Sequence, residues 1–418
     1  MNIRKKYLIS ILILTAGLVV VAGCSRRAAT TGPAPAEVSE GAQLPGLAHR
    51  NNQFAFDLNR ALIDERGNFV FSPYSISTAM AMTYAGAREA TLEQMASIMH
   101  FDTEQQRFHE AYRQYRETLE TLASDKVALN IANSLWAQSG YHFLDSYFEL
   151  LENYYASEVF EADFTADREE IRQEINHWVY VETRENIEDL IAPGVLSEDT
   201  RLVLVNAIHF FGPWLTEFDE SVTSEGRFNT AEGPAVTADF MYRRDTLNYY
   251  GDPDLQILEL PYAGKDFSMV LMLPAPGKSL AELERALDAP GLSDKLENMS
   301  PARVEAYIPR FKARTGIDLE ETFMGMGMHL PFTRDADLSG MTGRKDLKID
   351  KVIHQAMIEV AEEGTEAAAA TAVVVIRKTA LEPEERIVFN ANRPFLFFVK
   401  DNAHDGILFM GRVVDPTL

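Results

Sequence analysis

Residues 361–386 read AEEGTEAAAATAVVVIRKTALEPEER and carry most of the information about the fold. This stretch has no helical amphipathicity and no regular turn signals, although it lies between an apolar run, Lys351 to Val360, and the strand-like Ile387 to Asn390. Loops of about two dozen residues are uncommon inside compact domains, and those that occur are usually functional. The sequence therefore predicts an exposed functional loop at about residues 362–386.

The composition of this loop is that of a buried strand. Its first half consists of small residues, which fit a slot between close strands, and the β-branched residues Val373 to Ile376 favour a strand. Alternate side chains of a strand share a face, and one such set carries no charge: Thr365, Ala367, Ala369, Thr371, Val373 and Val375. The next residues, Arg377-Lys378-Thr379, offer a tryptic cleavage point. An ordinary edge strand or a flexible linker is the alternative interpretation.

Outside the loop, the hydrophobic pattern predicts one α+β domain, residues 49–418, that is rich in helices early and in strands late. We expect helices at Asn51–Leu62, Ser75–Ala85, Tyr147–Tyr155 and Glu169–Leu190. Ser75 or Ser77 is the expected cap of the second helix. We expect strands at Val127–Ala137, Arg201–Phe211, Gln256–Leu260, Phe267–Leu273, Arg303–Ile308, Pro394–Lys400 and Gly406–Val413.

The N-terminus has the pattern of a secretory address. Three basic residues precede an apolar run, Tyr7 to Ala22, that is short for a membrane span of about 20 residues. The only cysteine, Cys24, follows Val21-Ala22-Gly23, and this resembles the lipobox of bacterial lipoproteins. The resemblance implies a signal peptide at residues 1–23 and acylation of Cys24; a plain signal peptide or a short anchor helix is the alternative.

Residues 24–48 are rich in Ala, Thr, Gly, Pro and Ser, which predicts a flexible tether that follows the lipidated cysteine. The lipoprotein interpretation places the domain in a bacterial cell envelope, on the periplasmic face of the outer membrane or on the cell surface. The lipid anchor is then the only contact that we expect with a membrane. Two or more acyl chains are enough to give stable anchoring.

Composition excludes several classes of function. The chain has 418 residues and a formal net charge of −24, which argues against nucleic acid as a partner. One cysteine cannot build a disulfide framework or a Cys-based metal site within a chain. The histidines have no ligand spacing, and His354 lies in an apolar stretch, as a hydrogen-bonded core histidine would. No hydrolase, P-loop or zinc-protease motif occurs, so we expect no cofactor, no metal and no enzyme activity.

Several short motifs resemble those of one known family, and their order spans roughly Asn51 to Pro416. They include Asn68-Phe-Val-Phe-Ser-Pro-Tyr-Ser-Ile-Ser, Asn130-Ile-Ala-Asn-Ser-Leu-Trp, Leu202-Val-Leu-Val-Asn-Ala-Ile, Glu259-Leu-Pro-Tyr, Ile308-Pro-Arg-Phe, Asn392-Arg-Pro-Phe-Leu-Phe and Phe409-Met-Gly-Arg-Val-Val-Asp-Pro. Together with the loop, these motifs resemble the serpins. The resemblance implies a single domain with large mixed sheets and an exposed reactive-centre loop.

The resemblance also implies a function and site residues. A serine protease cleaves the loop, and the freed part inserts into the main sheet and traps the acyl-enzyme. The matching hinge residues are Glu362, Glu363, Gly364, Thr365, Glu366, Ala367, Ala368, Ala369, Ala370 and Thr371. The positions that match the family's sheet-opening region and loop entry point are Ser72, Pro73, Asn206, Trp214 and His354.

Counting from Gly364, the resemblance places the reactive bond between Lys378 and Thr379, with Arg377 as the neighbouring choice. We therefore expect a monomeric inhibitor of a trypsin-like protease. The run Val373 to Ile376 also suits an elastase-like enzyme, and a papain-like cysteine protease is a further possibility. The alternative function is that of a non-inhibitory serpin, a binding or chaperone-like protein, which usually carries bulky or charged residues in the hinge.

Overall fold

The computed structural model describes residues 44–63, 67–123, 127–365 and 386–418. The predicted signal peptide, Cys24 and most of the predicted tether lie outside these residues, as do Glu366 to Thr371 and the predicted reactive bond at Lys378. All described residues belong to one unit of the chain, residues 41–418. Within the described residues, no helix is both long enough and apolar enough to cross a membrane.

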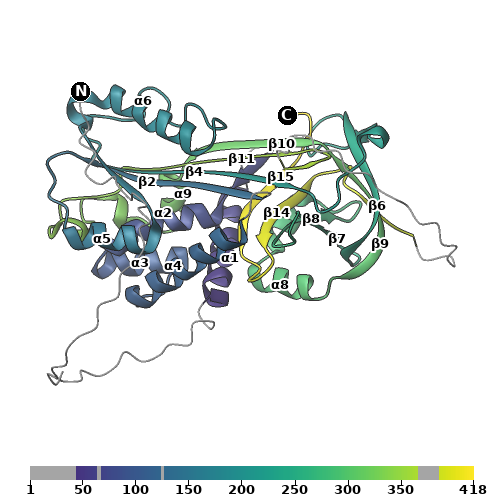
Figure 1. Cartoon of the computed structure of the whole chain (residues 1–418), viewed down its shortest axis with the longest axis horizontal. Coiled ribbons are helices and arrows are strands. Elements are labelled where there is room, and N and C mark those ends of the chain that lie inside the picture. Colours follow the sequence, from purple (N-terminus) through teal and green to yellow (C-terminus); the bar gives the residue numbers. More distant parts are fainter. Residues whose placement is uncertain (1–43, 64–66, 124–126, 366–385) are drawn as a thin grey trace, which may run out of the picture. The chain divides into compact units, whose positions relative to one another are not determined.

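A six-stranded sheet contains the apolar central strand that the sequence predicts (Figure 1). Its strands, in spatial order, are β10 Phe311–Asp318, β11 Lys351–Val360, β12 Gly364–Thr365, β4 Leu202–Pro213, β2 Ala128–Gln138 and β3 Glu158–Ala162. The short β12 separates β11 from β4 at one end only. Further along, β11 and β4 pair directly and in parallel, with Lys351–Met357 opposite Val203–His209. We call this direct pairing, residues 351–357 with 203–209, the seam.

The second sheet has nine strands and holds most of the late, strand-rich part of the chain. In spatial order its strands are β1 Phe69–Phe71, β15 Ile407–Val413, β14 Phe395–Asp401, β8 Phe267–Pro274, β7 Leu255–Pro261, β6 Val236–Gly251, β9 Ser300–Pro309 and β13 Ile387–Asn390, and β5 Ser224–Phe228 pairs with β6. Its central strands β8, β14 and β15 are buried along their whole length. They form much of the main hydrophobic core.

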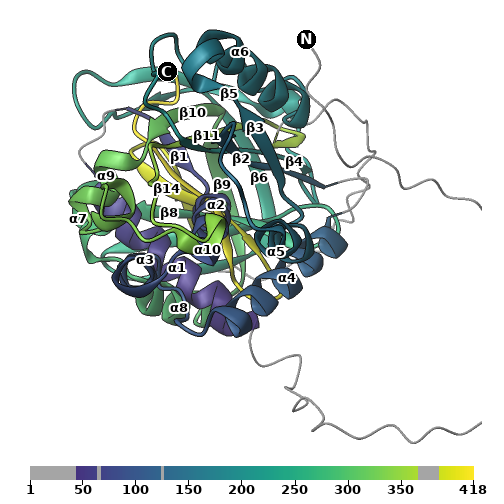
Figure 2. The ribbon, with the colours of Figure 1, turned by 90° about the vertical axis from the view of Figure 1, so that its left-hand side faces the viewer.

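The helices include the four that the sequence predicts and others that it does not, among them an 18-residue helix at Gln105–Leu122. They are α1 Leu44–Ala61, α2 Pro73–Gly86, α3 Glu89–Met99, α4 Gln105–Leu122, α5 Asp145–Tyr155, α6 Phe164–Glu182, α7 Leu280–Ala286, α8 Ala289–Glu297, α9 Glu320–Gly325 and α10 Ser339–Thr342, with short 3₁₀ turns at Glu220–Val222 and Leu330–Phe332. α2 contacts β2, β4 and β15, and α6 contacts β2. Figures 1 and 2 show α6 on the face of the six-stranded sheet opposite α2.

Helix α2 begins earlier than the sequence analysis places it. Its cap is Ser72, whose Oγ accepts a hydrogen bond from the backbone N–H of Ser75, and Pro73 occupies the first turn. The prediction of Ser75 or Ser77 as the cap is therefore wrong. Proline suits the first turn because its missing N–H would have no partner there. Every residue of α2 is buried, so the helix brings its polar N-terminus into the core.

The chain leaves α6 at Glu182, eight residues before the predicted end at Leu190. The Thr183 hydroxyl donates to the carbonyl of Val179 and accepts from the backbone N–H of Ile187, which turns the chain back over the sheet. No glycine or proline marks this stop, so the sequence gives no local signal for it.

The tether boundary also moves. Helix α1 begins at Leu44, and Leu47 and Ala48 are buried in the core. The last five residues of the predicted tether, 44–48, are therefore part of a packed helix. Only residues before 44 remain available for a tether.

Candidate functional site

The first feature of the site is the strand β12, which already lies between β4 and β11. Thr365 pairs with Val360 on one side and Gly212 on the other, and Gly364 pairs with Pro213. Thr365 is fully buried. A Cβ on Gly364 would lie 2.2 Å from the carbonyl oxygen of Gly212, so the close approach of the two backbones requires glycine. The sequence predicts an exposed loop from about residue 362, whereas Glu362 is buried and Gly364 and Thr365 are buried within the sheet.

Trp214 fixes the chain just before β12. Its backbone N–H donates to the carbonyl of Glu363 at 2.8 Å, and its indole Nε1 donates to the carbonyl of Ala361 at 2.9 Å. The indole stacks on Tyr262 with ring centroids 4.7 Å apart. The Tyr262 hydroxyl lies 2.8 Å from the hydroxyl of Thr365. Burial raises the pKa of Tyr262 well above its usual value, so the phenol keeps its proton for this hydrogen bond.

Glu362 anchors the same segment through a charge pair. Its carboxylate accepts from Arg310 Nε at 2.8 and 3.0 Å and from the hydroxyl of Thr223 at 2.5 Å. Glu362 is 3% exposed, and burial alone would raise its pKa. The hydrogen bonds from Arg310 and Thr223 outweigh burial and lower the pKa of this carboxyl, so the side chain stays ionised. We call Glu362–Thr365 and its partners the hinge end.

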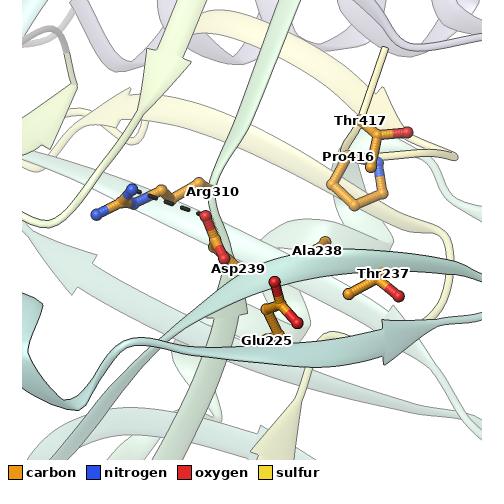
Figure 3. A pocket seen from close by; sticks show the side chains of 7 residues that line it. All are labelled: Glu225, Thr237, Ala238, Asp239, Arg310, Pro416 and Thr417. Atoms are coloured by element: carbon orange, nitrogen blue, oxygen red, sulfur yellow. Dashed lines mark ion pairs between the residues drawn. The ribbon is translucent and has the colours of Figure 1, made fainter.

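Arg310 is shared between the hinge end and a surface hollow of about 330 Å³ (Figure 3). Its Nη1 lies 3.8 Å from Asp239, and its Nη2 lies 3.5 Å from Glu220. Glu225 stands opposite Asp239 on the neighbouring strand and borders the same hollow. The Arg310 guanidinium therefore lies close to several carboxylates. Its hydrogen bond to Glu362 raises the pKa of Arg310.

The second feature is a buried row of polar side chains across the seam. Asn133 on β2, Asn206 on β4 and His354 on β11 occupy paired positions on adjacent strands. His354 Nε2 accepts from the backbone N–H of Ser72 at 3.1 Å, so its ring proton lies on Nδ1 and is donated to the Asn206 side-chain oxygen. The Asn206 amide nitrogen donates to both Asn133 and the hydroxyl of Ser75. We call Asn133, Asn206 and His354 the polar row.

His354 is neutral in this environment. It has no exposed surface, and burial lowers its pKa from 6.5 to about 3. A proton on Nε2 would also face the N–H of Ser72, which needs an acceptor. The interpretation of His354 as a hydrogen-bonded core histidine is confirmed. Its bond to Asn206 crosses the seam, so a strand that entered there would have to break it.

The far end of the loop is also fixed by charge. Arg386 lies 3.1 Å from Glu305, and Arg244 lies 3.8 Å from the same carboxylate. Glu305 is 6% exposed. The chain then continues as β13, which pairs in parallel with β9 from Ile387 to Asn390. The described residues on either side of 366–385 are therefore both fixed in the fold.

The structure brings the predicted site residues together as two groups. Ser72, Asn206 and His354 meet at the polar row, where Pro73 begins α2. Trp214 meets Glu362, Glu363, Gly364 and Thr365 at the hinge end. The other predicted residues lie outside the described part of the chain: Glu366, Ala367, Ala368, Ala369, Ala370, Thr371, Arg377, Lys378, Thr379 and Cys24.

Four residues that the structure places in the site are not predicted as site residues from the sequence: Asn133, Thr223, Tyr262 and Arg310. Three of them lie in motifs that carry the resemblance, namely Asn130-Ile-Ala-Asn, Glu259-Leu-Pro-Tyr and Ile308-Pro-Arg-Phe. Their position in these motifs was the signal in the sequence that could have identified them. Among the described residues, no three or more His, Cys, Asp or Glu side chains gather as metal ligands do.

Comparison with known proteins identifies the class. A family profile described as "Serpin (serine protease inhibitor)" matches residues 49–416. Human Serpin B4 is 38% identical over 392 residues, which cover 89% of this chain and all of that protein. The leukocyte elastase inhibitor of Sus scrofa is 37% identical, over 88% of this chain and 99% of its own length.

Solved structures agree. The native stressed conformation of the Arabidopsis serpin AtSerpin1 superposes with a TM-score of 0.81 and 31% identity, over 90% of this chain and 99% of that one. The chain belongs to the serpin family. It has the serpin fold, with helices packed on large mixed sheets in a single domain, and its relatives include protease inhibitors.

Proposed function

We propose that this serpin is an irreversible inhibitor of a serine protease, which it traps by inserting its cleaved loop into the six-stranded sheet. One observation carries the proposal: Thr365, small and uncharged, is already buried between β4 and β11 at the end of the seam. A bulky or charged side chain there would have to leave water without a partner. The hinge therefore has the chemistry of a strand that continues inward.

The chemical step belongs to the protease. Its serine oxygen attacks the carbonyl carbon of Lys378, and the peptide bond to Thr379 breaks. The ester between the protease serine and Lys378 remains, and the amine of Thr379 leaves with the C-terminal fragment. Insertion then carries the ester along the sheet, at about 3.3 Å per residue, before water can hydrolyse it. Distortion of the protease's oxyanion hole stops deacylation.

The registers of β12 indicate the path of insertion. Thr365 lies opposite Val360 and Gly212, and both pairings are antiparallel. Six residues further along each register, 365 becomes 371, 360 becomes 354 and 212 becomes 206. Continued insertion would thus bring Thr371 between His354 and Asn206. Its hydroxyl can accept from His354 and from the Asn206 amide, so it would replace the hydrogen bond that the entering strand breaks.

Apolar burial supplies the driving force for the rest of the path. The same registers would bring Val373 and Val375 onto the face of the sheet that Thr365 and Thr371 share. Each buried valine contributes roughly 1.5–3 kcal/mol. Each new ladder hydrogen bond adds about 0.5–1.5 kcal/mol. The uncleaved protein would then be metastable, held by a barrier rather than by equilibrium stability.

Incubation with trypsin, an elastase and papain, scored for complexes that survive SDS, tests this function. We expect a complex with trypsin and a released fragment that begins at Thr379. A fragment that begins at Lys378 would move the reactive bond to Arg377. Lys378→Ala should slow trypsin inhibition by at least about tenfold, because the trypsin pocket carries a buried carboxylate, and should spare an elastase. Cleavage by every protease without any complex would contradict the inhibitory function.

We also propose that Cys24 anchors the protein to a bacterial envelope membrane. The support is the sequence around Cys24 and the position of α1, which leaves residues 25–43 as a possible tether. Mass spectrometry of the native protein should find acyl chains on Cys24, and Cys24→Ser should release the protein from the membrane fraction. An unmodified Cys24 in membrane-bound protein would contradict the anchor.

A further inference from the structure

The solvent-facing side of the paired strands β6, β9 and β13 carries a group of arginines. The strand register places Arg244 of β6 opposite Glu305 of β9, and Arg303 lies two residues before Glu305 on the same strand. Arg386, just before β13, reaches the same carboxylate. The alternate residue Val304 is fully buried, so the charged side chains of β9 share the opposite face, which is open to water.

Positive charge is in excess on this face. In the rows that join β6, β9 and β13 within the described residues, three arginines accompany one carboxylate. The side chains of Arg244 and Arg386 are 44% and 71% exposed. The whole chain has a formal net charge of −24, so the sign of this face is opposite to that of the molecule. We call Arg244, Arg303 and Arg386, together with Glu305, the arginine face.

An apolar platform adjoins the arginine face. In the next row Tyr242 lies opposite Tyr307, with ring centroids 4.9 Å apart. Val388 of β13 lies opposite Glu305 and is 42% exposed, although it is apolar. Arginine and aromatic residues are enriched at protein interfaces and supply much of their binding energy. The combined surface therefore has the composition of a place where another protein docks.

The arginine face begins where the chain leaves the predicted reactive loop. Lys378 precedes Arg386 by eight residues, and a chain spans at most about 3.6 Å per residue, so the reactive bond lies within about 29 Å of Arg386. A protease domain of about 220 residues is roughly 44 Å across by the usual relation between size and length. A protease bound at the reactive bond is therefore wide enough for its rim to reach the arginine face.

We propose that the arginine face is a second docking surface for the target protease, and that it selects a protease with acidic residues beside its active-site cleft. Those carboxylates would pair with the guanidinium groups of Arg244 and Arg303, while the tyrosines and Val388 supply apolar contact area. Charges at the rim of an interface act mainly on the rate of association and on the choice of partner. This inference rests on the proposed inhibitory function. It adds a specificity that the residue at the reactive bond does not provide.

The test uses two trypsins, one with a net negative and one with a net positive charge, because both prefer the same residue at the cleaved bond. In each the catalytic serine is replaced by alanine, so that only docking on the intact protein is measured. Arg244→Gln with Arg303→Gln removes two charges from the arginine face. The control, Arg168→Gln with Arg344→Gln, gives the same net charge by removing two arginines elsewhere, whose side chains are 46% and 69% exposed.

At low salt the arginine-face double variant should bind the anionic trypsin about three- to tenfold more slowly than wild type does, and the cationic trypsin at the wild-type rate. The Arg168 and Arg344 control should bind the anionic trypsin as wild type does. Arg244→Lys with Arg303→Lys should restore most of the rate, because the charge is kept. The difference between variant and wild type should shrink at about 0.5 M salt, where the screening length falls to about 4 Å.

An equal loss of rate with both trypsins, or a loss with neither, would overturn this docking surface. So would dimerisation of the wild-type protein, seen by sedimentation and abolished in the arginine-face double variant, because a second copy would then be the occupant. Binding of the cationic trypsin at the wild-type rate shows that the variant is folded. If active anionic trypsin cut the protein without forming an SDS-stable complex, the inhibitory function alone would be contradicted, because docking of the inactive enzyme does not depend on trapping.

Discussion

The hinge end and the polar row hold the same two strands in opposite ways. At the hinge end β4 and β11 are already separated, and Thr365 pairs with both of them. At the polar row they touch directly, and His354 donates to Asn206 across the seam. The difference shows that one sheet accommodates both arrangements. Insertion of the loop would convert the second arrangement into the first.

The two regions also differ in what stabilises them. Glu362 is buried, but the side chain of its partner Arg310 is 38% exposed, so solvent screens that pair. The polar row has no contact with solvent at His354 and uses neutral hydrogen bonds. Salt should therefore act on the hinge end, and protonation should act on the polar row.

Cleavage of the loop should produce the largest change, because it would remove the difference between the two regions altogether. With a strand inserted along the whole seam, about ten new ladder hydrogen bonds and several buried valines are gained. We expect cleaved protein to melt roughly 20 °C or more above intact protein. Differential scanning calorimetry before and after limited proteolysis measures this. Equal melting temperatures would mean that no insertion follows cleavage.

Thr365→Arg should break the hinge end while leaving the polar row intact. The arginine would have to bury a charge beside Tyr262, whose neutral hydroxyl is the partner of Thr365. Cleavage at Lys378 should proceed at nearly the wild-type rate, but insertion should be slower than hydrolysis. The number of inhibitor molecules consumed per protease should rise at least about tenfold, the effect of about 1.4 kcal/mol on the partition.

Thr365→Ala serves as the control for that variant, since alanine is small and uncharged, and it should remain inhibitory. Titration of a fixed amount of trypsin against each variant gives the stoichiometry. An arginine variant that trapped trypsin with the wild-type stoichiometry would show that residue 365 does not have to enter the sheet.

Much of this contrast could be predicted from the sequence, because its parts are local patterns. The almost wholly apolar run of β4 predicts a central strand, and the uncharged alternation from Thr365 onward predicts a strand-like loop. The family motifs bring Ser72, Asn206 and His354 to attention. None of these patterns reveals that Thr365 is already inside the sheet, since that depends on how far β4 and β11 separate.

Other features could not be predicted, because they depend on pairs far apart in the chain. Arg310 and Glu362 are 52 residues apart, and Asn133 and Asn206 are 73 apart. A single sequence gives no information on such pairing. The end of α6 is a different kind of failure. Thr183 stops the helix with its own hydroxyl, and this residue type is common inside helices as well.

Acid should weaken the polar row by a measurable amount. Because burial lowers the pKa of His354 from 6.5 to about 3, the unfolded chain binds a proton first as the pH falls. Stability is therefore full above pH 6.5 and is lost progressively down to about pH 3, which amounts to about 2 kcal/mol at pH 5. Urea unfolding of wild type and His354→Gln between pH 7.5 and 5 should show a shallower pH dependence in the variant.

His109 is the matched control for that experiment. Burial lowers its pKa to about 4, but it lies against Tyr155 between α4 and α5, away from the seam. His109→Gln should flatten the pH dependence of unfolding in a similar way. Only His354→Gln should also flatten the pH dependence of the rate at which intact protein, incubated below its unfolding temperature, converts to a more heat-stable form. An equal effect of both variants on conversion would show that the polar row does not control opening of the sheet.

Thr371→Val should have the smallest effect, and it should appear in one state only. In the intact protein His354 and Asn206 bond to each other. After insertion the continued registers would bring residue 371 between them. Valine has the same shape as threonine but no hydroxyl, so the buried ring N–H and amide would lose a partner, at a cost of about 1–2 kcal/mol. The cleaved variant should therefore melt a few degrees below cleaved wild type, while the intact forms should melt together. Thr371→Ser keeps the hydroxyl and should restore most of the difference. If cleaved Thr371→Val matched cleaved wild type, another residue would occupy the polar row, and the path of insertion would be shifted in register.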